Sequence, residues 1–261
     1  MIDFLVETCL LCHGLVSISD DEMAEVFKGI PGAGFVWIEE GSLHTGDLEE
    51  FMRFRALRVK GRASMKTLDD FIARGKNAAL TASGTMRICC EMGIRLAVSC
   101  GIGGVSSIWD REVSDDLPGL AELNVPLIAT SPKDMMDIQE TINWLHDNNV
   151  KTYGVGVDKC TGYVFNSADV RLDGMFGGEI DREGEGSNQL ILNPIPGSER
   201  IQDLSILKKV VETGKEAASR GEHFHPAANA ALDKATDGLA SRIQLRSAAA
   251  NARLASRLIS H

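Results

Sequence analysis

Lys133 is the residue whose type and position most directly suggest chemistry in this sequence. It follows an apolar run at 125–129, which is typical of a buried parallel strand. Ser131 and Asp134 have the spacing of a helix N-cap and its third residue, and Pro132 suits the first helical position. We therefore expect Lys133 in the first turn of a helix, where the dipole disfavours an ammonium. A neutral lysine can form a Schiff base, and the alternative is a solvated lysine beside Asp134.

Other polar residues stand where further predicted strands end. They are Glu7, Ser99 with the following GIGG loop, the acidic loop from Glu112 to Asp116 with Ser114 and Asp115 in it, and Asn193. Each has a simpler explanation, as a surface carboxylate, a tight turn, a helix cap or a strand-end turn. Ligands of parallel sheets bind beyond the carboxyl ends of the strands, so the shared edge predicts one site.

The elements that would position these residues alternate along the chain. Apolar runs at 2–7, 35–38, 94–99, 125–129, 152–157 and 189–192 predict strands, and amphipathic stretches between them predict helices. This order is typical of a three-layer α/β/α fold with a mostly parallel sheet. From Asp203 onward the pattern is helical, with breaks near Gly221 and Gly238. We find no internal repeat or linker and expect one domain over residues 1–261.

Composition narrows the class of protein. The 261 residues carry a formal net charge of −10, which argues against nucleic acid as a partner and leaves room for a small phosphorylated substrate. No apolar run approaches the length of a membrane span. Asp3 and Glu7 make the start of the chain unlike a signal peptide. Six cysteines in no spaced framework are typical of a reduced compartment, so we expect a cytoplasmic protein.

One cysteine spacing could indicate a cofactor or a redox pair. Residues 9–13 read CLLCH, the C-x-x-C-H pattern of c-type haem attachment. Haem would need export and a second axial ligand, and the sequence signals neither. We interpret Cys9 and Cys12 as buried thiols, with a C-x-x-C redox pair as the alternative.

Several motifs, in order, resemble those of the pseudouridine-5′-phosphate glycosidases, also called indigoidine synthase A-like proteins. The likeness extends from about residue 6 to residue 259. It is carried by ET at 7–8, CHG at 12–14, GKN at 75–77, SGTM at 83–86, GIGGV at 101–105, VSDDL at 113–117, SPKDMMDI at 131–138 and NPIP at 193–196.

The resemblance implies an α/β/α enzyme that is typically a homotrimer. The family breaks the C–C glycosidic bond of pseudouridine 5′-phosphate to give uracil and ribose 5-phosphate, with a divalent metal that is typically manganese. The reverse ligation, the same chemistry on another aglycone, and a non-catalytic sugar-phosphate-binding paralogue are the alternatives.

The resemblance also implies roles for individual residues. Lys133 takes the place of the Schiff-base nucleophile on the sugar C1′, Glu7 that of the proton donor, and Glu112 that of a metal-linked Asp. The predicted substrate ligands are Arg62 (or Lys60 nearby), Ala82, Ser99, Ser114, Asp115, Asp116, Asn193 and Arg242.

Two positions depart from the family on the side expected to face the aglycone. Ser106 replaces a histidine and Arg242 replaces an asparagine. Arginine only donates hydrogen bonds and carries a fixed charge. We therefore predict a preference for an acidic or acceptor-rich aglycone over uracil, and the alternative is that Arg242 faces outward.

Overall fold

The predicted strands pair side by side in the computed structural model, which describes residues 2–57, 61–106, 112–180, 188–221 and 224–259. Within these residues ten strands form the main sheet, and its antiparallel pairings are those of β2 with β3 and β5. In spatial order the sheet runs β15 (Gly174–Met175), β12 (Lys151–Gly154), β16 (Gln189–Leu192), β9 (Leu127–Ala129), β6 (Ala97–Val98), β1 (Phe4–Val6), β2 (Ala33–Glu39), β5 (Ala78–Leu80) and β4 (Gly61–Ala63), with β3 (Ser42–Gly46) also beside β2. The mostly parallel sheet of the prediction is confirmed.

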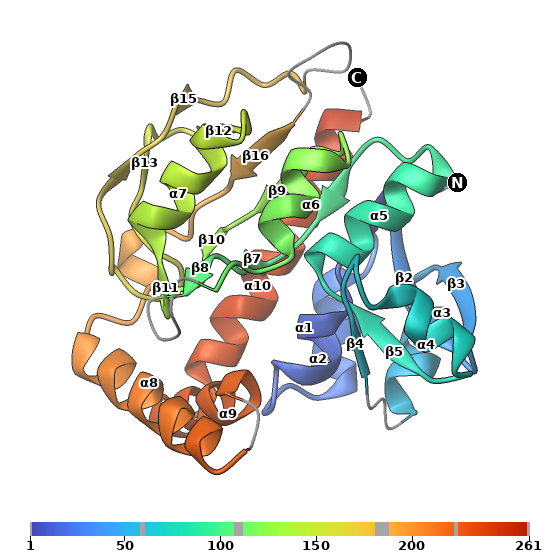
Figure 1. Cartoon of the computed structure of the whole chain (residues 1–261), viewed down its shortest axis with the longest axis horizontal. Coiled ribbons are helices and arrows are strands. Elements are labelled where there is room, and N and C mark those ends of the chain that lie inside the picture. The colour runs from blue at the N-terminus through green and yellow to red at the C-terminus, as the bar shows by residue number, and fades with distance from the viewer. Residues whose placement is uncertain (1, 58–60, 107–111, 181–187, 222–223, 260–261) are drawn as a thin grey trace.

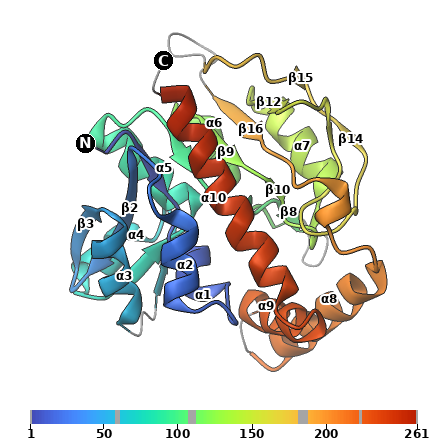
Figure 2. The same cartoon turned by 180° about the vertical axis from the view of Figure 1, so that it is seen from behind.

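Helices cover both faces of this sheet and enclose two apolar cores. Figure 1 shows α4 (Leu68–Ala73), α5 (Ala82–Met92), α6 (Asp116–Glu122) and α7 (Ile138–Asp147) on one side. Figure 2 shows the other side, with α1 (Cys9–His13), α2 (Asp20–Phe27), α3 (Leu48–Ala56) and the long α10 (Leu239–Ile259). The three-layer α/β/α prediction is therefore confirmed.

The helical C-terminal region is also as predicted. It consists of α8 (Leu204–Ser219), α9 (Phe224–Ala235) and α10, after a short turn of 3₁₀-helix at Gly197–Glu199. The breaks contain Gly221 and Gly238, whose φ angles of 79° and 74° favour glycine. Among the described helices, none, not even the 21-residue α10, combines the length and apolarity of a membrane span.

The register of the central strands aligns the ends that the sequence analysis singled out. Val6 pairs with Val98, and Ala129 pairs with Leu192. Because these strands are parallel, the residues that follow them emerge at the same edge of the sheet. Glu7 and Asn193 each continue the pairing by one more backbone hydrogen bond, to Val98 O and Ala129 O, both 2.8 Å long.

The segment after β9 differs from the prediction. Ser131 and Pro132 form the short strand β10 (Ser131–Pro132), which pairs in parallel with β7 (Gly101–Ile102) instead of starting a helix. A second short pair, β8 (Val105–Ser106) with β11 (Met136–Asp137), follows, and β13 (Lys159–Cys160) pairs with β14 (Val170–Arg171). The helix α7 begins only at Ile138.

Candidate active site

Lys133 lies in a loop between β10 and β11, so its predicted place in the first turn of a helix is wrong. Its backbone N–H donates to Ile102 O (3.0 Å), and its carbonyl accepts from Met136 N (2.8 Å). The helix that follows is capped instead by Asp137, whose side chain accepts from Glu140 N at 3.0 Å. The helix does not begin at the predicted place because Ser131 and Pro132 pair with β7 and because Asp137 caps the helix instead. The helix-dipole argument for a neutral lysine therefore does not apply.

Asp134, predicted to cap that helix, instead binds a neighbouring loop. Its buried carboxylate accepts backbone hydrogen bonds from Tyr163 (2.8 Å), Val164 (2.9 Å) and Phe165 (3.2 Å), and a hydroxyl bond from Ser167 (2.5 Å). Burial raises the pKa of Asp134, while these four donors oppose that shift. The residue after Lys133 thus anchors the Lys133 loop to residues 163–167.

Glu7 stands directly after β1 and is 6% exposed. Burial raises the pKa of its carboxyl group, and the positive charge of Lys133 is the strongest influence in the opposite direction. The Ser99 hydroxyl donates a short hydrogen bond to Glu7 Oε2. A buried glutamate with a raised pKa holds its proton to higher pH than usual, as a proton donor requires.

Lys133 lines a polar pocket of about 220 Å³. Asp116 is fixed in its wall because its two carboxylate oxygens accept from Ser83 N (2.9 Å) and Gly103 N (2.8 Å). A Cβ on Gly103 would lie 2.1 Å from Ser114 Oγ, so this close approach requires glycine. The lining residues are Arg62, Ser64, Thr81, Ser83, Gly103, Gly104, Ser106, Glu112, Ser114, Asp115, Asp116, Lys133 and Met136.

Asp115 and Glu112 give this pocket two further carboxylates. Asp115 accepts from Ser64 Oγ at 2.6 Å and forms an ion pair with Lys66 at 2.8 Å. Burial would raise the pKa of Asp115, but the hydrogen bonds from Lys66 and Ser64 outweigh burial and lower it. Glu112 is exposed at the rim. The acidic loop of the sequence therefore contributes to the wall of one pocket.

Lys133 also lines two smaller hollows of about 20 Å³ each, which lie toward the C-terminal helices. The first contains Glu7, Cys9, His13, Arg62 and Asn229. The second contains Tyr163, Val164, Phe165, Asn229 and Gln244 among its lining residues. Lys133 and Asn229 are common to both, so Asn229 is a candidate contact that the sequence analysis missed.

The remaining predicted ligands lie behind or outside these hollows. Ala82 is buried in the core at the start of α5, while Thr81 and Ser83 on either side of it line the pocket. Ser99 and Asn193 line none of these hollows, and their side chains donate to Glu7 and to Asn251, respectively. Lys60 is outside the described residues.

Arg242, predicted to face the aglycone, lies away from these hollows. Its Nε is 3.7 Å from Glu22 Oε1, and its Nη1 donates to Asp237 O at 3.3 Å. The structure therefore does not bring Arg242 together with Lys133, as the outward-facing alternative expected. Ser106, the other departure from the family, does line the polar pocket.

A family model described as "Indigoidine synthase A like protein" matches residues 33–261. The chain belongs to this family. It is 28% identical over 234 residues to the pseudouridine-5′-phosphate glycosidase of Caldanaerobacter subterraneus subsp. tengcongensis, covering 83% of this chain and 76% of that protein. It is 27% identical to the enzyme of the same name from Petrotoga mobilis, covering 95% and 88%.

Two solved structures share the fold of this indigoidine synthase A-like chain. One is the indigoidine synthase A-like protein of Thermotoga maritima, with a TM-score of 0.80, 21% identity, and coverage of 98% of this chain and 91% of that one. The other is the prealnumycin C-glycosynthase AlnA in complex with ribulose 5-phosphate, with a TM-score of 0.81, 21% identity, and coverage of 98% and 90%.

The two thiols of the C-x-x-C-H segment lie in surroundings that disfavour the thiolate form. Cys9 is buried, and burial raises the pKa of its thiol to about 11. The half-buried Cys12 has its pKa raised to about 12 for the same reason. Because the thiolate is the reactive species, these raised pKa values favour the interpretation of Cys9 and Cys12 as buried thiols over that of a redox pair.

A protein cage for a metal ion is not found within the described ranges, where no three His, Cys, Asp or Glu side chains converge. Asp116 and Asp115 already accept hydrogen bonds from the protein, which leaves Glu112 as the carboxylate at the pocket rim. One carboxylate suits a cation that keeps most of its water ligands, as Mg²⁺ does. The residues fit such a loosely held cation only.

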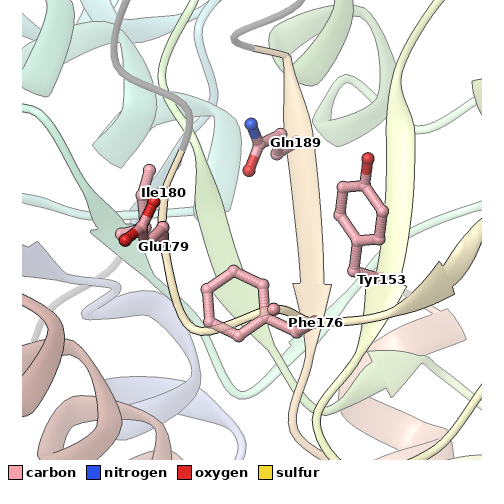
Figure 3. A pocket seen from close by; sticks show the side chains of 6 residues that line it. Tyr153, Phe176, Glu179, Ile180 and Gln189 are labelled. Atoms are coloured by element: carbon pink, nitrogen blue, oxygen red, sulfur yellow. The ribbon is translucent and has the colours of Figure 1, made fainter.

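A second hollow, of about 380 Å³, lies on the sheet near β15. Tyr153 of β12 and Gln189 of β16 contribute from the strands, and Phe176, Glu179 and Ile180 contribute from the segment after β15 (Figure 3). The residues of this hollow are distinct from those around Lys133.

Proposed function

We propose that the chain is a lysine-dependent C-glycosidase, or the corresponding C–C ligase, that acts on pseudouridine 5′-phosphate. The observation that carries this proposal is that Lys133 and the buried Glu7, whose carboxyl pKa is raised, line one hollow beside a polar pocket. The relatives named pseudouridine-5′-phosphate glycosidase and the ribulose 5-phosphate complex of AlnA support it.

A carbon-linked base is a poor leaving group until the sugar supplies an electron sink. In the proposed reaction, the C1′–O4′ bond opens and O4′ receives a proton from Glu7, while the amine nitrogen of Lys133 forms a bond to C1′. The nitrogen of Lys133 then loses a proton, the C1′–C5 bond breaks, its electron pair leaves with the base, and the base carbon takes up the proton released from the nitrogen. The nitrogen lone pair forms the C=N bond, and water releases the sugar as an aldehyde.

The polar pocket offers the groups that a sugar phosphate needs. Arg62 lines both this pocket and the Glu7 hollow, and its guanidinium can bind a phosphate through two parallel hydrogen bonds. Ser83, Ser114 and the fixed carboxylate of Asp116 can exchange hydrogen bonds with sugar hydroxyls. We assign the sugar 5-phosphate to this side of Lys133.

The aglycone then falls on the other side of Lys133, toward α9. Asn229 presents a neutral carboxamide there, which both donates and accepts, as one edge of uracil requires. The preference for an anionic aglycone rested on Arg242, which is paired with Glu22 instead. We therefore propose uracil, and product analysis distinguishes it from another aglycone.

Borohydride trapping tests the proposed chemistry. Reduction in the presence of ribose 5-phosphate should attach one sugar phosphate to the peptide that contains Lys133. The variant Lys133→Ala should lose this label, and the matched control Lys66→Ala, which removes the other lysine beside Asp115, should keep it. Absence of labelling in the wild type, or equal labelling of Lys133→Ala, would show that the assignment is wrong.

A divalent cation, manganese in the first instance, is proposed at Glu112, where it would supply positive charge beside the bound phosphate. Chelator treatment should lower turnover, and Mn²⁺ should restore it in the wild type but not in Glu112→Ala at the same concentration. Turnover that is indifferent to chelator and to Mn²⁺ would exclude this role. We also propose a homotrimer, which light scattering of the purified chain tests directly.

A further inference from the structure

A stripe of polar side chains runs along the buried side of α10. Gln244, Ser247 and Asn251 recur at spacings of three and four, so they share one helix face. Ser241 is also buried and donates to Asp233, while the other buried residues of α10 are apolar, and the helix as a whole packs on the sheet (Figure 2). Polar groups at such positions cost free energy unless they are hydrogen-bonded.

Asn251 is fully buried, and its side chain joins three separate segments. Its Nδ2 donates to Ser99 O (2.8 Å) and to Thr130 Oγ1 (3.0 Å), and its Oδ1 accepts from Asn193 Nδ2 (3.0 Å). Both donors and the acceptor of the amide are therefore used. One side chain holds all three positions at fixed separations.

The three partners of Asn251 each follow the last residue of a strand. Ser99 follows β6, Thr130 follows β9, and Asn193 follows β16. At each of these positions one more backbone hydrogen bond continues the pairing, from Ser99 N to Ile128 O, from Thr130 N to Cys100 O and from Asn193 N to Ala129 O. The side chain of Asn251 therefore joins three strand ends by hydrogen bonds at the point where the chain enters the site.

Two of these segments lead directly to the reactive groups. The hydroxyl of Ser99 donates to Glu7, while its carbonyl accepts from Asn251. Thr130 lies three residues before Lys133, and only the two-residue strand β10 separates them. The position of the proton donor and the position of the lysine are thus both tied to one buried amide.

We propose that Asn251 is a positioning residue that sets Glu7, through Ser99, and Lys133, through the Thr130 loop, relative to each other. This inference rests on the proposed function for its kinetic consequences. Asn251 itself touches neither the pocket nor the substrate side of Lys133, and it acts through Ser99 and Thr130.

The test compares Asn251→Leu, which keeps the volume and removes the hydrogen bonds, with the matched control Asn188→Leu. Asn188 directly precedes β16 at the opposite end of the sheet, and its amide donates to Ala121 O at 2.7 Å. In Asn251→Leu we expect kcat to fall about 10- to 100-fold with KM nearly unchanged, because small displacements of reacting groups have effects of this size. Asn188→Leu should change stability alone.

The pH profile gives a readout that a purely structural role would not move. The hydrogen bond from Ser99 favours the carboxylate form and opposes the raised pKa of Glu7. If Asn251→Leu displaces Ser99, this opposing effect weakens and the pKa of Glu7 rises further. Activity depends on protonated Glu7, so its alkaline limb should move to higher pH, and Asn251→Ser serves if the leucine variant does not fold.

Crystal structures of the same variants separate this inference from the proposed function. Ser99 and Thr130 should shift in Asn251→Leu and not in Asn188→Leu, whatever reaction the protein performs. A wild type that traps no ribose 5-phosphate contradicts the proposed function, while the shift still decides the role of Asn251. Unmoved Ser99 and Thr130, or an alkaline limb and kcat equal to those of Asn188→Leu, would overturn the inference.

Discussion

The hollow near β15 and the polar pocket beside Lys133 differ in a way that their volumes do not indicate. The hollow near β15 measures about 380 Å³ and the polar pocket beside Lys133 about 220 Å³. The larger one is lined by side chains that project from within strands, such as Tyr153 and Gln189, and by one short segment after β15 (Figure 3). The smaller one collects residues of loops, helix starts and short strands from distant parts of the chain.

This difference indicates that a site on a parallel sheet is recognised by polar residues that converge from distant segments and by the opposite charges or hydrogen-bond donors that stabilise them. Around Lys133, a buried carboxyl group with a raised pKa lies opposite a lysine, and Asp116 is held by two backbone donors. Near β15, Glu179 is exposed and its pocket contains no opposing cation among the lining residues described. Perturbed groups with specific partners mark a functional site better than volume does.

Apart from the loss of Lys133 itself, replacing Glu7 should cause the largest fall in activity, which no substitution in the hollow near β15 should match. Glu7→Gln removes the proton donor, so kcat should fall roughly 10²- to 10⁴-fold, the range of general acid catalysis. The same change should stabilise the fold at neutral pH. In the wild type the folded protein must hold an ionisable carboxyl group away from water, whereas the amide of glutamine does not ionise. Denaturant unfolding should show a gain of roughly 1 kcal/mol, the scale of single stabilising substitutions.

The pH dependence of that gain follows from the raised pKa of Glu7. Below the unfolded-state value of about 4.3, the group is protonated in both states and the wild type has no penalty. As pH rises through the higher folded-state pKa, the wild type loses stability relative to Glu7→Gln. A gain that is largest in acid, or full activity of the glutamine variant, would contradict the proton-donor role.

The sequence predicted the edge of the sheet better than it predicted the loops that follow. Apolar runs fixed β1, β6, β9 and β16, and parallel pairing then required Glu7, Ser99 and Asn193 to meet. The helix start at Lys133 failed because a non-local pairing with residues 101–102 prevails over a local capping pattern. Such pairing depends on tertiary contacts that the local pattern does not contain.

The C-terminal helices show a second feature that depends on tertiary contacts and that the sequence does not predict. Their existence was predictable from periodicity, but which side chain approaches Lys133 depends on how each helix is rotated against the sheet. Position matching placed Arg242 there, whereas the structure places Asn229 there. Asn251 did leave a signal, since it is a polar residue among Ala248, Ala252 and Ala255 on a buried face.

Within the helical region, replacing Asn229 should have an effect of intermediate size, and replacing Arg242 should have almost none. Asn229→Leu should raise the KM for uracil in the condensation with ribose 5-phosphate about tenfold, because one good hydrogen-bonding contact is worth about 1–1.5 kcal/mol. Trapping of ribose 5-phosphate alone should be unchanged, since no aglycone is then present. Arg242→Asn should leave both measurements within about twofold. An effect confined to Arg242→Asn would restore the role predicted from the sequence.

The smallest effect is expected at the hollow near β15, and it tests the comparison most directly. Gln189 is 4% exposed, and its side chain lines this hollow. Gln189→Leu exchanges this amide for an apolar group of similar size, so the free energy of unfolding should stay within about 1 kcal/mol or rise. Activity should stay within about twofold, because Gln189 is at the amino end of β16 and the site is beyond its carboxyl end. A loss of kcat in Gln189→Leu without a loss of stability would mean that the two hollows are coupled through β16, and the distinction drawn here would fail.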